Sequence, residues 1–342
     1  MSFSIENRRY IGNKSKLNDW IMHIIQSNTH NAYSFCDIFA GTGTVAAAAL
    51  SLQDRENTPL YQKVILNDLL FSNHVIYNAF FAEGQFSIPK LQALLDEWNA
   101  AQITEDNWFS ENYGNTYFSL DVARKAGYIR QQIEDRKSDL KDKEYFILLA
   151  SLIYSLDRLA NTVGHFEAYI KKPTGKNDLK LQLIEAQSFN SIEIHQEDSN
   201  QLARKIQADI VYIDPPYNSR QYSRFYHVYE TLVKWNKPEL FGVARKPAPE
   251  NMSEYCSSRA YNALQDLIDH LQAKYIAVSY NNTYNSRSKS SQNKISLEQI
   301  EALLRTKGET QVFTHQYNAF NSGKTDLKDH KEYLFFTTVS NL

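Results

Sequence analysis

An acidic residue, two prolines and a tyrosine follow a short apolar run at 208–213, in the order Asp214-Pro215-Pro216-Tyr217. Each proline fixes φ near about −65° and has no N–H to donate, so the turn is rigid. Asp214 and the Pro215 carbonyl can therefore both accept hydrogen bonds from one planar amino group, which turns the nitrogen lone pair toward an electrophile. The Tyr217 ring offers a face on which a heterocycle can stack. This pattern predicts chemistry at the amino group of an aromatic base.

A second turn, Asp37-Ile38-Phe39-Ala40-Gly41-Thr42-Gly43, follows another apolar run and leads into an Ala-rich helical segment. Glycines between a strand and a helix let a ligand approach the backbone, although they could also simply turn the chain. Because no third glycine and no Lys-Ser/Thr follow, the turn fits neither a dinucleotide fingerprint nor a P-loop. Asp37 would attract an ammonium group, and Asp68, after the next apolar run, could accept both ribose hydroxyls. These residues favour S-adenosylmethionine as the cofactor.

Seven apolar, β-branched runs are predicted to be the strands that position these turns. The first five are too far apart for hairpins, which predicts crossover connections and a parallel sheet, whereas the last two predict an antiparallel hairpin. We therefore expect an α/β fold: a doubly wound, seven-stranded, mostly parallel sheet with a C-terminal antiparallel hairpin, Rossmann-like in type. The predicted strands are 34–38, 63–66, 192–195, 209–213, 274–278, 311–315 and 333–339.

The segment 83–190 has no convincing strand and is much longer than one crossover helix requires. Helical periodicity occurs at 90–98, 122–137 and 143–159. We interpret 83–190 as an inserted helical domain and residues 1–82 together with 191–342 as the catalytic domain.

Composition is that of a globular protein of about two domains: 342 residues, 42% hydrophobic and 22% charged, with a net charge of −2. Two cysteines, Cys36 and Cys256, cannot form a disulfide framework, and no apolar stretch approaches the roughly 20 residues that span a bilayer. Since the N-terminus also lacks a signal-peptide pattern, we expect a cytoplasmic protein without a membrane partner. None of the nine histidines has metal-ligand spacing, so no metal is expected.

Taken together, the motifs resemble those of the alpha group of N6-adenine-specific DNA methyltransferases, which includes the Dam-like methylases. The resemblance extends over the chain in the same motif order, beginning with Arg9-Tyr10-Ile11-Gly12-Asn13-Lys14-Ser15-Lys16-Leu17, although many members have Gly-Gly-Lys where this chain has Gly12-Asn13-Lys14. It implies that Tyr10 and Lys14 line the pocket for the methionine end of S-adenosylmethionine.

Further residue roles follow from the same resemblance. It implies that Phe39 packs on the cofactor beside Asp37, Gly41 and Gly43, that Asp68 binds the ribose and that Asp198 meets the cofactor adenine. It also makes Asp214, Pro215, Pro216 and Tyr217 the catalytic residues, and it places target recognition in the inserted domain.

The resemblance implies methyl transfer from S-adenosylmethionine to N6 of an adenine flipped out of a specific double-stranded DNA sequence. It further implies a restriction-modification context, with a cognate endonuclease as a partner, and we expect the methylase to act as a monomer. Three alternatives stay open: an rRNA methyltransferase acting on adenine N6 or guanine N2, a catalytically silent DNA-binding relative, and a glutamine N5 methyltransferase. The last normally has Asn where this chain has Asp214.

Near-neutral net charge gives no global sign of DNA binding, so local basic and aromatic segments are the candidates. Residues 271–297 contain no acidic residue, and a polar, aromatic and basic loop is predicted at 279–289. The residues directly after the catalytic turn form a second candidate. The predicted DNA-binding residues are Arg220, Tyr222, Arg224, Tyr280, Tyr284, Arg287 and Lys289.

Overall fold

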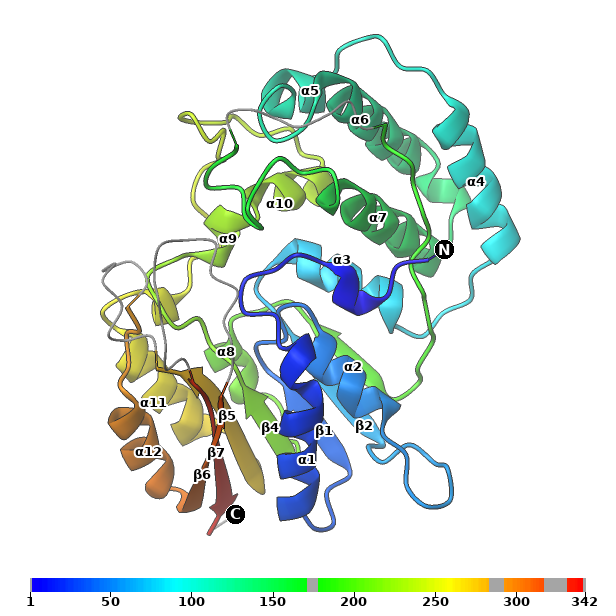
Figure 1. Cartoon of the computed structure of the whole chain (residues 1–342). Coiled ribbons are helices and arrows are strands. Elements are labelled where there is room, and N and C mark those ends of the chain that lie inside the picture. Colours follow the sequence, from blue (N-terminus) through cyan, green and yellow to red (C-terminus); the bar gives the residue numbers. More distant parts are fainter. Residues whose placement is uncertain (1, 171–177, 283–291, 317–330, 341–342) are drawn as a thin grey trace. The chain divides into compact units, whose positions relative to one another are not determined.

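The computed structural model describes residues 2–170, 178–282, 292–316 and 331–340 (Figure 1). The chain divides into two compact units. We call the first the helical unit; it consists of Met1–Asn13, Leu70–Ile194 and Tyr222–Glu250. The second, the sheet unit, consists of Lys14–Leu69, His195–Gln221 and Asn251–Leu342. Each is described separately.

The strands form a seven-stranded sheet in the order β3-β2-β1-β4-β5-β7-β6. Strand β1 pairs in parallel with β2 and β4, and β4 pairs in parallel with β5, whereas β7 pairs antiparallel with both β5 and β6. The predicted fold class, a mostly parallel sheet with an antiparallel C-terminal hairpin, is therefore confirmed. The strands are β1 (Ser34–Asp37), β2 (Lys63–Asn67), β3 (Ile192–His195), β4 (Ile210–Ile213), β5 (Tyr275–Asn281), β6 (Gly308–Gln316) and β7 (Lys331–Val339).

The strand order reverses between β1 and β4, because β2 and β3 lie on one side of β1 and β4, β5, β7 and β6 lie on the other. Ligands of open α/β sheets bind outside the carboxyl ends of the strands at such a reversal. The glycine turn follows β1 and Asp214 follows β4, so the sheet places the two predicted sites next to each other.

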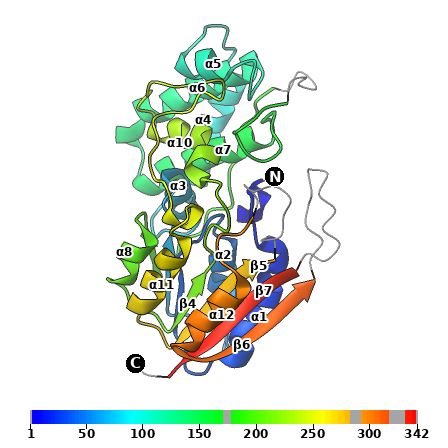
Figure 2. The same ribbon diagram turned by 90° about the vertical axis from the view of Figure 1, so that its left-hand side faces the viewer.

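Helices cover both faces of the sheet within the sheet unit (Figures 1 and 2). One face carries α1 (Asn18–Asn28) and α2 (Thr44–Ser51), and the other carries α8 (Ser199–Ala203), α11 (Ala260–His270) and α12 (Leu297–Arg305). Helix α12 begins after Ser296, whose hydroxyl accepts a hydrogen bond from the Gln299 amide. Such a cap stabilises a helix start by about 1 kcal/mol.

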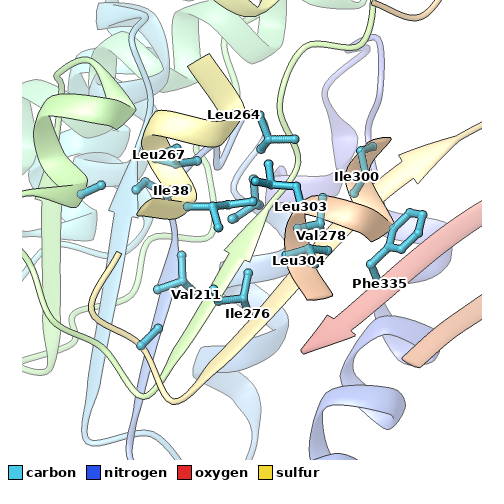
Figure 3. Packing of buried hydrophobic residues seen from close by; sticks show 14 of the residues in the cluster. Ile38, Val211, Leu264, Leu267, Ile276, Val278, Ile300, Leu303, Leu304 and Phe335 are labelled. Atoms are coloured by element: carbon cyan, nitrogen blue, oxygen red, sulfur yellow. The ribbon is translucent and has the colours of Figure 1, made fainter. Parts of the chain in front are cut away.

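The core under α11 and α12 shows why these strands and helices form (Figure 3). Apolar residues at every second strand position, such as Ile276 and Val278 of β5, point to one face. They pack against helical positions three or four apart, such as Leu264 and Leu267 of α11. Phe335 of β7 extends the same core, and each fully buried side chain of this kind contributes about 1.5–3 kcal/mol.

The helical unit contains α3 (Phe71–Phe80), α4 (Ile88–Ala100), α5 (Trp108–Tyr113), α6 (Leu120–Asp135), α7 (Asp142–Asp157), α9 (Tyr222–Phe225) and α10 (His227–Lys234). The three helices predicted in the insertion are present as α4, α6 and α7. Four short 3-10 helices also occur in the described residues, at Ile5–Asn7, Ser15–Leu17, Lys137–Asp139 and Glu254–Cys256.

The helical unit is larger than the predicted segment 83–190, because α10 holds neighbouring helices together through buried charges. The Glu230 carboxylate accepts hydrogen bonds from the Phe71 and Ser72 amides (3.2 and 2.7 Å) at the start of α3. The buried Arg130 guanidinium of α6 donates to the carbonyls of Leu232 and Val233 (2.8 and 3.1 Å) in the last turn of α10. Spacing in the sequence does not reveal these contacts between distant segments.

Within the described residues, none of the helices combines the length and the apolar character that crossing a bilayer requires. Both cysteines, Cys36 in β1 and Cys256, are buried free thiols.

Candidate active site

Asp214 lies immediately after β4 and is the centre of a small polar cluster in the sheet unit. One of its oxygens, Oδ1, is 3.3 Å from the Lys14 ammonium and accepts a hydrogen bond from the Tyr217 hydroxyl. The Asp214 side chain keeps 16% of its surface exposed. Burial raises the pKa of Asp214, and the positive charge of Lys14 opposes this rise. The nearby lysine thus favours the ionised carboxylate that an amine-binding role requires.

Lys14 begins the sheet unit and is itself buried, with 5% of its side chain exposed. Its Nζ donates a hydrogen bond to the Tyr217 hydroxyl (2.8 Å) and lies 5.0 Å from the centre of the Tyr217 ring. It also lies 3.8 Å from Oε2 of Glu332 on β7. A lysine is stable at this depth only where carboxylates balance its charge. The resemblance predicted Lys14 beside the cofactor; in the structure it lies next to Asp214.

Tyr217 is fixed by contacts at both ends of its side chain. The hydroxyl reaches Asp214 and Lys14, while the ring meets the Tyr280 ring edge to face, with 4.6 Å between centroids. Burial raises the pKa of Tyr217 well above its usual value, and the negative charge of Asp214 adds to the rise. The hydroxyl therefore stays protonated and serves as a donor.

Asp37 at the end of β1 is the carboxylate predicted to meet an ammonium group. It is 1% exposed, and among the described residues its Oδ1 has no hydrogen-bond partner. Burial raises the pKa of Asp37 well above its usual value, with further contributions from the charges of Asp214 and Asp68 and an opposing one from the Phe39 amide. A buried acceptor without a partner is costly and points to a donor supplied by a ligand.

The glycine turn lies between β1 and α2, where the sequence predicted a strand-to-helix turn. Gly41 and Gly43 have φ of 52° and 77°, in the left-handed region that favours glycine. Asp68 accepts a hydrogen bond from the Gly41 amide (3.1 Å), so the ribose-binding candidate and the turn are held together. The turn ends at Gly43, and α2 begins at Thr44. The chain thus offers a close approach to its backbone beside two carboxylates.

The residues after β3 complete this side of the sheet unit. Asp198 caps α8, because its carboxylate accepts hydrogen bonds from the Asn200 and Gln201 amides (3.0 and 3.1 Å). The Phe39 ring meets the Tyr255 ring edge to face at 5.0 Å. The capping role is a second function for Asp198, in addition to the predicted contact with adenine.

Asn67 is fully buried and joins three segments. It was not among the site residues predicted from the sequence, which assigned only its neighbour Asp68 to the ribose. Its amide donates to the carbonyls of Ile38 and Glu197 (3.2 and 3.0 Å), and its oxygen accepts from the Glu197 amide (3.1 Å). It therefore positions the turn after β1 relative to the segment that leads into α8. The only indication of this role in the sequence is that Asn67 directly precedes Asp68.

Three predicted residues belong to the helical unit and form contacts there. The Tyr10 ring stacks on the rings of Tyr222 and Tyr226, with centroids 5.4 and 4.4 Å away. The Tyr222 hydroxyl donates to the Ile11 carbonyl (3.2 Å), and Arg224 donates to the Pro247 carbonyl (2.7 Å). These contacts give all three residues a structural role in the helical unit.

Tyr280 was predicted to lie in a loop that contacts DNA, and this placement is wrong. It is part of β5 and is 1% exposed, because pairing with β7 continues to Asn281 opposite Glu332. In the same unit, the Arg220 amide donates to the Asn218 side chain (3.1 Å). The remaining predicted DNA contacts, Tyr284, Arg287 and Lys289, lie outside the described residues.

Glu332 was missed by the sequence reasoning. It stands in a hairpin strand more than a hundred residues after Asp214, without any motif around it. Only the strand register brings it to Lys14. In the part of the chain that the structure describes, no group of three or more His, Cys, Asp or Glu side chains could hold a metal ion.

The parallel sheet with its antiparallel C-terminal hairpin, the glycine turn after β1 and the Asp-Pro-Pro-Tyr turn after β4 together define a Rossmann-like methyltransferase fold. Residues 10–295 match the family model of the D12 class N6 adenine-specific DNA methyltransferases. The chain belongs to this family.

Similar proteins include three methylases. The type II methyltransferase M.FokI of Planomicrobium okeanokoites is 30% identical over 96% of this chain and 52% of its own length. M.NlaIII of Neisseria lactamica is 29% identical over 94% of this chain and 95% of its own length. M.CviAII of Paramecium bursaria Chlorella virus 1 is 30% identical over 96% and 98%. The chain therefore spans about half the length of M.FokI and nearly all of the other two.

Proposed function

We propose that the chain transfers the methyl group of S-adenosylmethionine to N6 of an adenine flipped out of a specific double-stranded DNA sequence. The observation that carries this proposal is the position of Asp214, at the end of the strand that pairs with β1 and its glycine turn. Family membership supports the choice of adenine and of DNA.

The residues around the turn after β1 fit the cofactor. Asp37 offers a buried acceptor suited to the methionine ammonium, Gly41 and Gly43 leave room at the backbone, and Asp68 can accept the ribose hydroxyls. Phe39 and Asp198 are proposed to meet the rest of the cofactor. When bound, S-adenosylmethionine supplies an electrophilic methyl group whose bonding electrons remain on sulfur.

The amine is held by this chain's own groups. Asp214 and the Pro215 carbonyl accept hydrogen bonds from both amino protons, so the N6 lone pair is drawn out of its delocalisation into the ring and can be directed at the methyl group. As the new N–C bond forms, N6 gives up one of these protons, and the Asp214 carboxylate is placed to accept it. Pro216 keeps the turn rigid and Tyr217 lies beside the base. Such a site accelerates transfer through positioning and electrostatics. Removing the base from the duplex costs a few kcal/mol, which the contacts in the site offset.

The helical unit is the proposed target-recognition part, since in this family the inserted segment reads the DNA sequence. Arg220, Tyr222 and Arg224 stay proposed DNA contacts because they follow the catalytic turn, and Arg287 and Lys289 because of their charge. We further propose that the methylase acts as a monomer and protects DNA from an endonuclease that cleaves the same sequence.

The test is transfer of a labelled methyl group from S-adenosylmethionine to duplex DNA, followed by digestion and identification of the modified nucleoside. We expect label in N6-methyl-2′-deoxyadenosine from DNA and none in nucleosides from ribosomal RNA assayed in parallel. Label in RNA alone would contradict the proposal in favour of an rRNA enzyme. Single-molecule sequencing of DNA from expressing cells would then give the recognition sequence.

The variant Asp214→Ala separates catalysis from cofactor binding. We expect it to abolish methyl transfer, because nothing then holds the amine, while S-adenosylmethionine still binds in equilibrium dialysis. Asp209→Ala is the matched control, since this aspartate lies at the opposite end of β4, where it pairs with Lys274 (2.7 Å). Turnover by Asp214→Ala equal to that of the control would overturn the assignment.

A further inference from the structure

Glu332 is a buried carboxylate that the proposed reaction has not yet used. It belongs to β7, pairs in register with Asn281 of β5, and is 5% exposed. Side chains alternate along a strand, so Glu332 lies on the face opposite Tyr333 and Phe335, which pack on the core under α11 and α12. On that opposite face its carboxylate reaches Lys14.

Lys14 is therefore shared between two carboxylates. Its ammonium is 3.3 Å from Asp214 and 3.8 Å from Glu332, and it also donates to the Tyr217 hydroxyl. Asp214, in turn, already accepts from Tyr217 and Lys14 on the same oxygen. A carboxylate has two oxygens, so an amino group that binds Asp214 shares the carboxylate with the Lys14 ammonium and competes with it for the negative charge.

The buried position of Lys14 makes this competition costly unless a second negative charge is present. An ammonium that lost its only carboxylate at 5% exposure would be left uncompensated. Glu332 supplies the second charge, so Lys14 can leave Asp214 and remain in an ion pair.

We propose that Glu332 is a positioning residue of the methyl-transfer site, which holds Lys14 when the target amine shares the Asp214 carboxylate with the lysine. The proposal rests on the proposed function, because it concerns the amine substrate of Asp214. It predicts that Glu332 affects the rate of transfer on the pH plateau, where Asp214 is ionised, only through Lys14, whereas its negative charge acts on the acid limb directly.

The pH dependence of transfer distinguishes this role from a purely structural one. The charged and titratable groups that face Asp214 are Lys14 from the N-terminal segment, Tyr217 from its own turn, Glu332 from β7, Asp37 from β1 and Tyr212 from β4. Lys14 stabilises the ionised form of Asp214, whereas the negative charge of Glu332 disfavours it. Glu332→Gln should therefore move the acid limb of the pH–rate profile to lower pH.

The experiment measures single-turnover methylation of duplex DNA at saturating S-adenosylmethionine across pH, for wild type, Glu332→Gln, Lys14→Met and the double variant. In Glu332→Gln, Lys14 loses its ion pair with Glu332 and depends more on Asp214, so we expect a rate loss of roughly tenfold or more. S-adenosylmethionine binding should be unchanged. An unshifted acid limb, a wild-type rate or a loss of cofactor binding would each overturn the proposal.

The double variant keeps the test decisive if Glu332→Gln does not fold, because it removes both buried charges together. We expect its plateau rate to equal that of Lys14→Met, since Glu332 has no role there without the lysine. A further loss in the double variant would show an independent role and overturn the proposal. If the wild-type chain itself transferred no methyl group to DNA, the proposed function would fail, whereas these comparisons concern Glu332 alone.

Discussion

Asp37→Asn is predicted to stabilise the protein without cofactor and to weaken cofactor binding. Asp37 is buried, one of its oxygens lacks a hydrogen-bond partner among the described residues, and its pKa is raised by burial and by Asp214 and Asp68. A carboxyl group whose pKa is higher in the folded state favours folding at low pH and opposes it as pH rises through that pKa. At neutral pH, which lies above the usual pKa of an aspartate, this shift is therefore a cost, which the amide removes.

The size of the effect follows from the contacts of this carboxylate. Asparagine keeps one oxygen to accept from the Phe39 amide and loses the buried charge. The Nδ2 of asparagine takes the place of the unpaired oxygen, so the variant removes the negative charge and not the unpaired atom. Because a buried charge without a partner costs more than a neutral polar atom, the free energy of unfolding should rise by about 1–3 kcal/mol. For a chain of 342 residues the entropy of unfolding is about 0.7 kcal/mol/K, so the corresponding increase in Tm is roughly 1–4 °C.

Cofactor binding should change in the opposite direction. A hydrogen bond to a charged group contributes about 1.5–3 kcal/mol, so the loss of the carboxylate should weaken S-adenosylmethionine about 10- to 100-fold. At a concentration of 100 times the wild-type Kd, the ligand stabilises wild type by about 2.7 kcal/mol. A variant with about 30-fold weaker binding would gain only about 0.9 kcal/mol.

The assay is thermal unfolding with and without S-adenosylmethionine. Asp209→Asn is the control: Asp209 accepts from the Tyr33 and Ser34 amides, pairs with Lys274, and has a lowered pKa chiefly because these partners outweigh burial. The control should unfold at lower temperature and keep the full cofactor shift. If Asp37→Asn were less stable than wild type and kept the wild-type cofactor shift, the reasoning would be refuted.

Three further predictions concern other contacts. Asp68→Ala should weaken S-adenosylmethionine binding about tenfold in equilibrium dialysis, because the ribose acceptor is lost; unchanged affinity would contradict the assignment. Burial lowers the pKa of Lys143 to about 8, so between pH 8 and 10.5 this lysine is neutral in the folded chain and charged in the unfolded chain. The free energy of unfolding of wild type relative to Lys143→Met should therefore rise over that interval. A difference that stays constant with pH in urea titrations would contradict this prediction. Charge reversal at Arg287 and Lys289 should weaken DNA binding in gel-shift titrations without changing sequence preference, whereas a changed preference would show that these residues read bases.

Local patterns were sufficient to predict the positions of the two turns after β1 and β4, because the residues of each turn are adjacent in the sequence. The run before Asp214 is a buried strand, and the prolines after it end the strand, so both the element and the exposed turn follow from a few consecutive residues. The turn at Gly41 and Gly43 could be predicted in the same way, because glycine between a strand and a helix permits the positive φ that both residues have. The rule for parallel sheets then placed both turns at one edge.

Contacts that depend on register between distant strands were not predictable in this way. The sequence ended the fifth strand at 278, because 279–289 is polar; pairing with β7 instead extends β5 to Asn281 and buries Tyr280. The same extension sets Glu332 opposite Asn281 and within 3.8 Å of Lys14. A slip of one residue in the pairing would turn Glu332 to the other face of the sheet. The register of the antiparallel hairpin therefore determines whether the negative charge of Glu332 lies near Lys14, although the hairpin contains none of the recognisable motifs. A variant that disturbs this register should therefore methylate DNA more slowly than wild type, even though Asp214 and Lys14 are intact.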